Sequence, residues 1–191
     1  MRFKTLVNGI ALFIGLGLAV YSQFDKNSQR ASDEPATVGQ RQKLEKWQLK
    51  PGSIYDGDTL RVVRGNEELK IRFCGIDAPE IKQPLGIESR DYLRSLVELG
   101  NGELLLLPIE KDRYGRTVAE VYVQDSDEFA INLNMQMVRD GYAWLYGQYK
   151  DNCPTKNELV LAEEVAREEG LGVWNGNHLP PWEFRANQPK S

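Results

Sequence analysis

The sequence predicts an α+β fold in which a small, partly open β-barrel of the OB type is followed by helices. Two observations predict this class. Short apolar segments bounded by turn residues dominate the chain just after residue 46, and helical periodicity dominates its later part. The 191 residues, 41% of them hydrophobic and 27% charged, suffice for one well-buried domain.

Residues 1–22 have the features of an export signal or a membrane anchor. A basic start, MRFK, precedes an apolar run over residues 5–21, whose length is at the low edge for a membrane span. The small-residue pair Val20 and Ser22 is a weaker cleavage site than A-x-A, so a cleaved signal and an uncleaved anchor remain open. In both cases we expect the body to lie outside the cytoplasm, secreted or anchored, and to meet the membrane only through this segment.

The organisation after this segment follows from composition. Residues 23–46 are polar and predict a linker, residues 47–186 one folded domain, and residues 187–191 a short tail. The net charge is −4, and the body is the acidic part because residues 1–46 hold more basic than acidic side chains. An acidic body argues against a protein that holds nucleic acid through bulk positive charge.

The barrel is predicted from two strand pairs. SIYDGDTLRVV (53–63) and ELKIRFCGI (68–76) flank the turn Arg64-Gly65-Asn66-Glu67, whose Gly-Asn pair favours a tight hairpin. ELLLLPIEKD and RTVAEVYVQ form the second pair around the loop 112–115.

Three helices are predicted around these strands. The first covers about residues 87–99, and the second about 132–140, where Gly141 ends it. The third begins with the capping box Thr155-Lys156-Asn157-Glu158 and ends at Gly170.

The reactive side chains limit the chemistry. The chain has one histidine, His178, which we interpret as a surface or capping residue, and two cysteines. A Cys/His zinc site would have to use nearly all of them, so we do not expect one. Carboxylates and arginines remain, and they suit Ca²⁺ or Mg²⁺ together with an anionic substrate. Cys74 and Cys153 are either free and buried or paired with each other, and both alternatives stay open.

The stretch RFCGIDAPE concentrates Arg72, Asp77 and Glu80 where a predicted strand turns. Asp58 stands at the end of the strand that the hairpin brings beside it, so Asp58 and Asp77 can converge on one cation. Asp56 is interpreted instead as a turn residue before Gly57.

Five segments, IYDGDTL, RFCGIDAPE, DRYGRTVAEVYV, NMQMVRDGYAW and AEEVAREEGLGVW, resemble the staphylococcal nuclease (thermonuclease) family in that order, over residues 47–176. The resemblance implies a five-stranded OB-type barrel with about three helices. It also implies a Ca²⁺-dependent endonuclease that hydrolyses DNA and RNA with little sequence preference. The domain 47–186 would then be a nuclease domain.

The resemblance also implies roles for individual residues. Asp58, Asp77 and the main-chain carbonyl of Ala78, where the archetype has Thr, would bind Ca²⁺. Glu80 would be the general base, while Arg72 and Arg116 would hold the scissile phosphate. The nucleotide pocket would be lined by Arg113, Tyr114 and Tyr149, and Gly147 stands where the archetype has a second aromatic residue.

Two alternatives remain beside this interpretation. Arg116 could serve only as a structural salt bridge to Asp112, although Gly115 lets the loop bend toward a ligand. The whole domain could also be a non-catalytic OB-fold module that binds nucleic acid or protein. Retention of the complete set of matching aspartates, arginines and glutamate favours the enzyme. We expect it to be monomeric and to prefer single-stranded or frayed nucleic acid.

Overall fold

The computed structural model describes residues 43–124 and 129–189. The predicted signal or anchor, and the predicted linker up to residue 42, lie outside the described residues. The first strand begins at Glu45, so the last two residues of the range 23–46 are part of it. Within the described residues no helix is long and apolar enough to cross a membrane.

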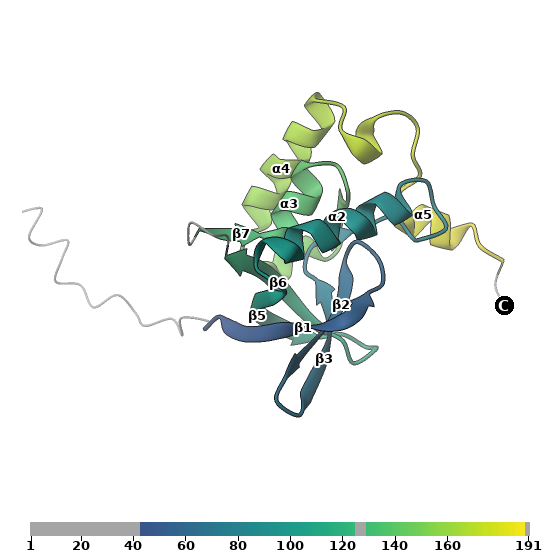
Figure 1. Ribbon diagram of the computed structural model, residues 1–191. Helices are drawn as coiled ribbons and strands as arrows, with labels where there is room; N and C mark the ends of the chain where they lie inside the picture. Colours follow the sequence, from purple (N-terminus) through teal and green to yellow (C-terminus); the bar gives the residue numbers. More distant parts are fainter. Residues whose placement is uncertain (1–42, 125–128, 190–191) are drawn as a thin grey trace, which may run out of the picture. The chain divides into compact units, whose positions relative to one another are not determined.

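A mixed β-barrel forms the centre of the described body (Figure 1). Antiparallel pairings give the strand order β3-β2-β1-β5-β6-β7, and a parallel pairing of β3 with β6 closes the barrel. Its five strands are β1 (Glu45–Ile54), β2 (Thr59–Arg64), β3 (Glu67–Phe73), β5 (Glu103–Lys111) and β6 (Thr117–Gln124). The short strands are β7 (Ala130–Asn132), which extends the sheet, and the separate pair β4 (Ile76–Asp77) and β8 (Trp144–Leu145). The predicted five-stranded barrel is therefore confirmed.

The predicted β2–β3 hairpin is also confirmed, with Arg64 opposite Glu67 and Thr59 opposite Arg72. The strand before it was not predicted as a separate element. Ser53 and Ile54 end β1, and the chain turns over residues 55–58 before β2 begins. The chain therefore makes two turns in close succession, one over residues 55–58 and one between β2 and β3. The first of them places the DGD segment just before β2, at the open end of the hairpin.

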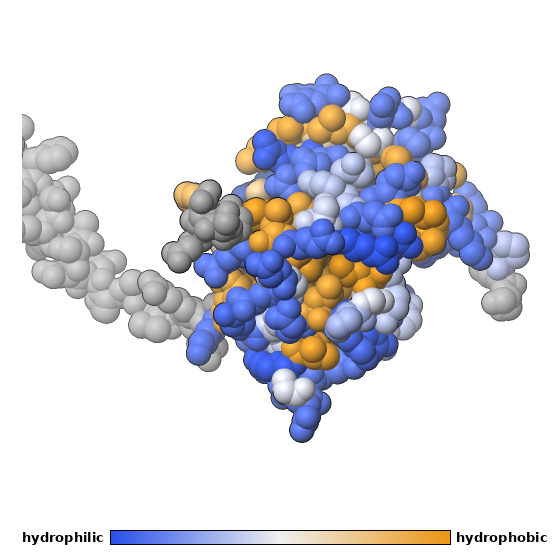
Figure 2. All heavy atoms as spheres, in the orientation of Figure 1, coloured by the Kyte–Doolittle hydropathy of each residue, from blue (hydrophilic) through white to orange (hydrophobic). Residues whose placement is uncertain are grey.

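Four α-helices accompany the barrel in the described residues. They are α2 (Gly86–Leu99), α3 (Leu133–Arg139), α4 (Lys156–Glu168) and α5 (Pro181–Ala186), with 3-10 turns η1 (Lys150–Asn152) and η2 (Gly172–Trp174). Helix α3 packs with α4, and α5 lies beside the loop that leads into α2 (Figure 1). Helix α2 buries Ser89, Leu93, Leu96 and Val97 on one side, and the face that it presents to solvent is largely hydrophilic (Figure 2).

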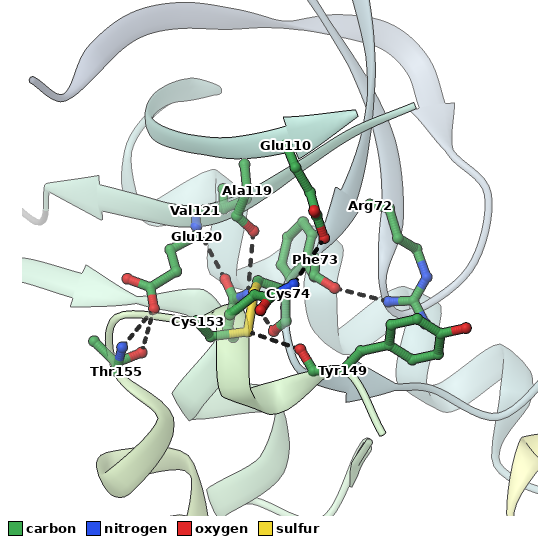
Figure 3. Close-up of a disulfide and its surroundings, with 12 residues drawn as sticks. Arg72, Phe73, Cys74, Glu110, Ala119, Glu120, Val121, Tyr149, Cys153 and Thr155 are labelled. Atoms are coloured by element: carbon green, nitrogen blue, oxygen red, sulfur yellow. Dashed lines mark hydrogen bonds between the residues drawn. A yellow bond between two sulfur atoms is a disulfide. The ribbon is translucent and has the colours of Figure 1, made fainter. Parts of the chain in front are cut away.

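Two features of the helices differ from the prediction. Helix α4 lies where it was expected, but Thr155 does not form the capping box: its Oγ1 and its backbone N–H donate to the Glu120 carboxylate at 2.7 and 2.8 Å (Figure 3). The fully buried Glu120 thus places negative charge at the start of the helix, where the helix dipole favours it. Helix α5 was not predicted, because the prolines at its start are typical of an irregular tail.

The structure pairs Cys74 with Cys153, so the alternative of free cysteines does not hold (Figure 3). Their Cα atoms are 5.9 Å apart, and both residues are buried. Cys74 follows β3, and Cys153 follows η1, a few residues after Tyr149. Gly75 (φ 72°) allows this contact, because a Cβ there would lie 2.9 Å from the Cys153 sulfur. The bond therefore fixes the Tyr149 segment against the end of β3.

Reduction of this disulfide should lower the melting temperature. A bridge across a sequence separation of 79 residues removes many conformations from the unfolded chain. Such bonds typically contribute about 2–4 kcal/mol, which corresponds to roughly 4–16 °C in a domain of this size. Thermal melts with and without reductant measure the shift. A Cys74→Ser/Cys153→Ser variant should have the lower melting temperature both with and without reductant. Two thiols that can be alkylated in the denatured, unreduced protein would contradict the disulfide.

Candidate active site

A cleft of about 640 Å³ opens at the end of the β2–β3 hairpin. Its lining comes from the DGD turn, the turn after β3, the loop between β5 and β6, the Tyr146–Tyr149 segment and α5. All the site residues predicted from the sequence line this cleft: Asp58, Arg72, Asp77, Ala78, Glu80, Arg113, Tyr114, Arg116 and Tyr149. The structure therefore brings together side chains from segments far apart in the sequence.

The DGD turn packs directly on the turn that follows β3. The Asp58 carboxylate accepts a hydrogen bond from the Ala78 backbone N–H at 2.7 Å, and Asp56 accepts one from the Asp58 backbone at 3.1 Å. Asp56 thus forms the expected turn. Gly57 permits the packing, because a Cβ there would come within 2.8 Å of the Ala78 Cβ and closer still to Ser89. The close contact holds Asp58 and Asp77 side by side.

Arg72 joins these two aspartates. Its Nη2 lies 2.9 Å from Asp77 Oδ1 and 3.3 Å from Asp58 Oδ2, and its Nη1 donates to the Phe73 carbonyl at 2.9 Å. All three charged side chains are largely buried, with 13% of Arg72, 7% of Asp58 and 3% of Asp77 exposed. Carboxylates this close and this buried require positive charge beside them.

The same crowding affects proton affinities. Burial, and then the charge of Asp58, raise the pKa of Asp56 to about 7. Burial raises the pKa of Asp77 as well, although hydrogen bonds from Arg185 and the charges of Arg72 and Arg185 oppose the rise. The Asp56 and Asp77 carboxyl groups therefore hold a proton more readily than free carboxyl groups do, mainly because they are buried.

The donor set fits a hard divalent cation. Asp58 and Asp77 have carboxylate oxygens on adjacent turns, and Ala78 lines the same cleft. In the described residues these oxygens accept from Arg72, Arg185 and the Ala78 backbone N–H, so a cation would share them with these donors or displace them. Within the described ranges, no group of three or more His, Cys, Asp or Glu side chains is arranged as a metal site. A cation here would therefore complete its shell with carbonyl and water oxygens, which Ca²⁺ accepts readily.

Glu80 lies at the edge of the cleft with 38% of its side chain exposed. Its backbone N–H donates to Gln83 Oε1 at 2.9 Å, and its Oε1 accepts from Arg185 at 2.7 Å. Both its backbone and its side chain are thus held in a loop without regular secondary structure.

The parallel β3–β6 pairing sets Thr117 opposite Ile71 and Val118 opposite Arg72, and Arg116, just before β6, lines the same cleft as Arg72. Its Nε donates to Asp112 Oδ2 at 2.6 Å, so the salt bridge considered as an alternative is present. Burial alone would raise the pKa of Asp112, but hydrogen bonds from Arg116 and Tyr114 lower it overall. The described residues make no hydrogen bond to Nη1 or Nη2 of Arg116, so both remain available to an anion.

Exposed aromatic rings stand at the mouth of the cleft. Tyr114 is 69% exposed, and its ring lies 5.0 Å from the Arg113 guanidinium and 5.5 Å from that of Arg116. Tyr149 is 48% exposed, and its ring centroid lies 4.9 Å from that of Tyr146. These rings can stack on bases, and the cations beside them can bind phosphate.

Sequence reasoning missed Arg185. This residue of α5 donates to Asp77 Oδ2 at 2.7 Å and to Glu80 Oε1 at 2.7 Å. A signal was present in PPWEFR, since a proline at the first helical position favours a helix start, and Pro181 occupies that position. His178 lies apart from the cleft lining, with Nε2 3.1 Å from the Asn175 carbonyl oxygen.

Comparison with known proteins identifies the family of the chain. The family model described as "Staphylococcal nuclease homologue" matches residues 70–176. An "Uncharacterized endonuclease" of Escherichia coli is 37% identical over 133 residues, which are 69% of this chain and 80% of that protein. One of Haemophilus influenzae is 39% identical over 137 residues, 71% of each chain. A "Micrococcal nuclease" of Shigella flexneri is 35% identical over 137 residues, 69% of this chain and 76% of that protein. The chain belongs to the staphylococcal nuclease homologue family.

Proposed function

We propose that the protein is a Ca²⁺-dependent endonuclease that hydrolyses phosphodiester bonds of DNA and RNA with little sequence preference. The nuclease class is supported by the family and by the names of the relatives. One observation carries the finer proposal: a single cleft joins a buried aspartate pair, arginines and a partly exposed glutamate. These are the groups that phosphodiester hydrolysis needs for charge neutralisation, phosphate binding and water activation.

The roles follow from this arrangement. Bound between Asp58, Asp77 and the Ala78 carbonyl, Ca²⁺ would polarise a phosphoryl oxygen and neutralise developing charge. Arg116 would donate hydrogen bonds from both Nη groups to the phosphate oxygens, while its Nε donates to Asp112. Arg72 would add a second positive charge from the side of the aspartates.

Glu80 is the proposed general base. The described residues hold only its Oε1, so Oε2 can accept a proton from the attacking water. Because Glu80 and Asp77 are connected by the short segment Ala78–Pro79, the water and the phosphate can be bound next to each other.

Substrate binding would use Arg113, Tyr114 and Tyr149 at the mouth of the cleft. Stacking on tyrosine is tolerant of sequence and needs unpaired bases, which supports a preference for single strands. We also propose that the enzyme acts as a monomer outside the cytoplasm. The N-terminal sequence and the disulfide support an oxidising location.

Chelation of Ca²⁺ should abolish cleavage. Purified protein is expected to degrade denatured DNA and RNA with Ca²⁺ and to stop when EGTA is added, because the aspartate pair needs the cation to hold a phosphate. Excess Ca²⁺ should restore the rate, as followed by acid-soluble nucleotide release. Equal rates in EGTA would reject Ca²⁺ dependence, and binding without cleavage would favour a non-catalytic module.

Replacing Glu80 by glutamine should lower kcat by roughly 10²–10⁴-fold, the usual contribution of a general base. The amide keeps the shape of the side chain and its acceptor for Arg185, so the melting temperature should stay close to that of the wild type. Glu110→Gln is the matched control, because Glu110 lines the same cleft and has no proposed role. Full activity of Glu80→Gln would remove Glu80 from the mechanism.

Arg116→Lys should lower kcat/KM by roughly 10–100-fold, because lysine retains the charge and loses the forked pair of donors. Arg116→Ala should lose more. Steady-state kinetics on a short oligonucleotide measure both. Arg61→Lys is a control outside the cleft, where the arginine pairs with Glu68 at the surface. If Arg116→Ala cleaves at the wild-type rate, the salt bridge to Asp112 is the only role left for this arginine.

A further inference from the structure

Arg185 reaches the candidate site from outside the part of the chain that matches the family model, which ends at residue 176. Its guanidinium makes a two-point contact with the Asp77 carboxylate, from Nη2 to Oδ2 at 2.7 Å and from Nη1 to Oδ1 at 3.3 Å. The same Nη1 donates to Glu80 Oε1 at 2.7 Å. One side chain therefore links a proposed metal ligand to the proposed general base.

Helix α5 is itself anchored to the site. Trp182 stacks on Tyr146 with ring centroids 5.3 Å apart and planes 2° from parallel, and its edge meets Trp144 at 6.5 Å. Just before the helix, the Leu179 carbonyl accepts a hydrogen bond from the Gln83 side chain at 3.0 Å. Because α5 is short, these aromatic contacts are what keep Arg185 in place.

Gln83 is a second connection between the loop that carries Glu80 and the segment that leads into α5. While its Nε2 donates to Leu179, its Oε1 accepts from the Glu80 backbone N–H at 2.9 Å. Gln83 is buried, with 7% of the residue exposed. The segment 179–185 thus restrains Glu80 at both its backbone and its carboxylate.

The burial of the partners separates this contact from an ordinary surface ion pair. Exposed pairs contribute little, because two mobile side chains must be ordered in water. Asp77 is only 3% exposed and cannot exchange Arg185 for water at low cost. Glu80 is 38% exposed and would otherwise rotate among several conformers.

We propose that Arg185 is a positioning residue, which fixes the Asp77 and Glu80 carboxylates relative to each other and does not contact the substrate. The inference rests on the proposed function of these two carboxylates. Groups that orient metal-binding carboxylates commonly affect activity by about 10–100-fold, and small displacements of a catalytic group have similar effects.

The kinetic test compares Arg185→Met, Arg185→Lys and Arg94→Met. Arg94 is the matched control: it lies on a helix, is 43% exposed against 42% for Arg185, and pairs with Asp91 away from the cleft. With saturating Ca²⁺, Arg185→Met should lose roughly 10–100-fold in kcat while KM changes by less than about two-fold. Lysine should recover part of the loss, because it restores the charge with a single point of contact. Arg94→Met should behave as the wild type.

A second measurement needs neither metal nor activity. Amide hydrogen exchange over residues 77–83 of the Ca²⁺-free protein should be faster in Arg185→Met than in the wild type, and unchanged in Arg94→Met. Melting temperatures show whether each variant is folded, and if Arg185→Met is not, Arg185→Lys is compared with the wild type in both measurements.

Three results would overturn the inference. A raised KM with unchanged kcat would make Arg185 a substrate contact. Faster cleavage by Arg185→Met at limiting Ca²⁺ would make it a competitor of the cation. Wild-type kinetics together with wild-type exchange would leave it no role. If the wild-type protein itself fails to cleave with Ca²⁺, the proposed function fails, and the exchange experiment still decides whether Arg185 orders the loop.

Discussion

The buried contact of Arg72 with Asp58 and Asp77 is the interaction on which the site depends. Two carboxylates cannot be held side by side in the interior without positive charge, and the guanidinium supplies it together with directional hydrogen bonds. The barrel provides the necessary rigidity. Arg72 lies on β3, which pairs with β2 on one side and β6 on the other, so the arginine cannot move without disturbing both neighbours.

Much of this arrangement follows from local sequence. The hairpin turn at Gly65-Asn66, the DGD turn and the turn after β3 are specified by glycine, proline and short polar residues, whose preferences act over a few positions. Because these turns are local, the convergence of Asp58 and Asp77 could be predicted before the fold was known. The position of Arg116 was harder to derive from the residues alone, since it depends on the parallel β3–β6 pairing between distant segments.

The features that escaped prediction depend on tertiary contacts. Thr155 begins a helix as expected, but the buried Glu120 competes for its hydroxyl and replaces the capping box. Helix α5 is too short to be stable by itself and is held by Trp182 on Tyr146. Arg185 could therefore not be assigned to the site until the position of that helix was known. The pairing of Cys74 with Cys153 was open for the same reason, because the sequence does not fix the distance between them.

The disulfide links the integrity of the cleft to the redox state of its surroundings. Thiols of a newly made chain stay reduced in a typical cytosol. Before oxidation, the end of β3 and the segment that follows Tyr149 would not be covalently linked. Under the function and location proposed above, a nuclease of low sequence preference that acts outside the cytoplasm, the cell must protect its own nucleic acids during synthesis. A bond that closes only after export would offer such self-protection, because full stability would come only when the chromosome is out of reach.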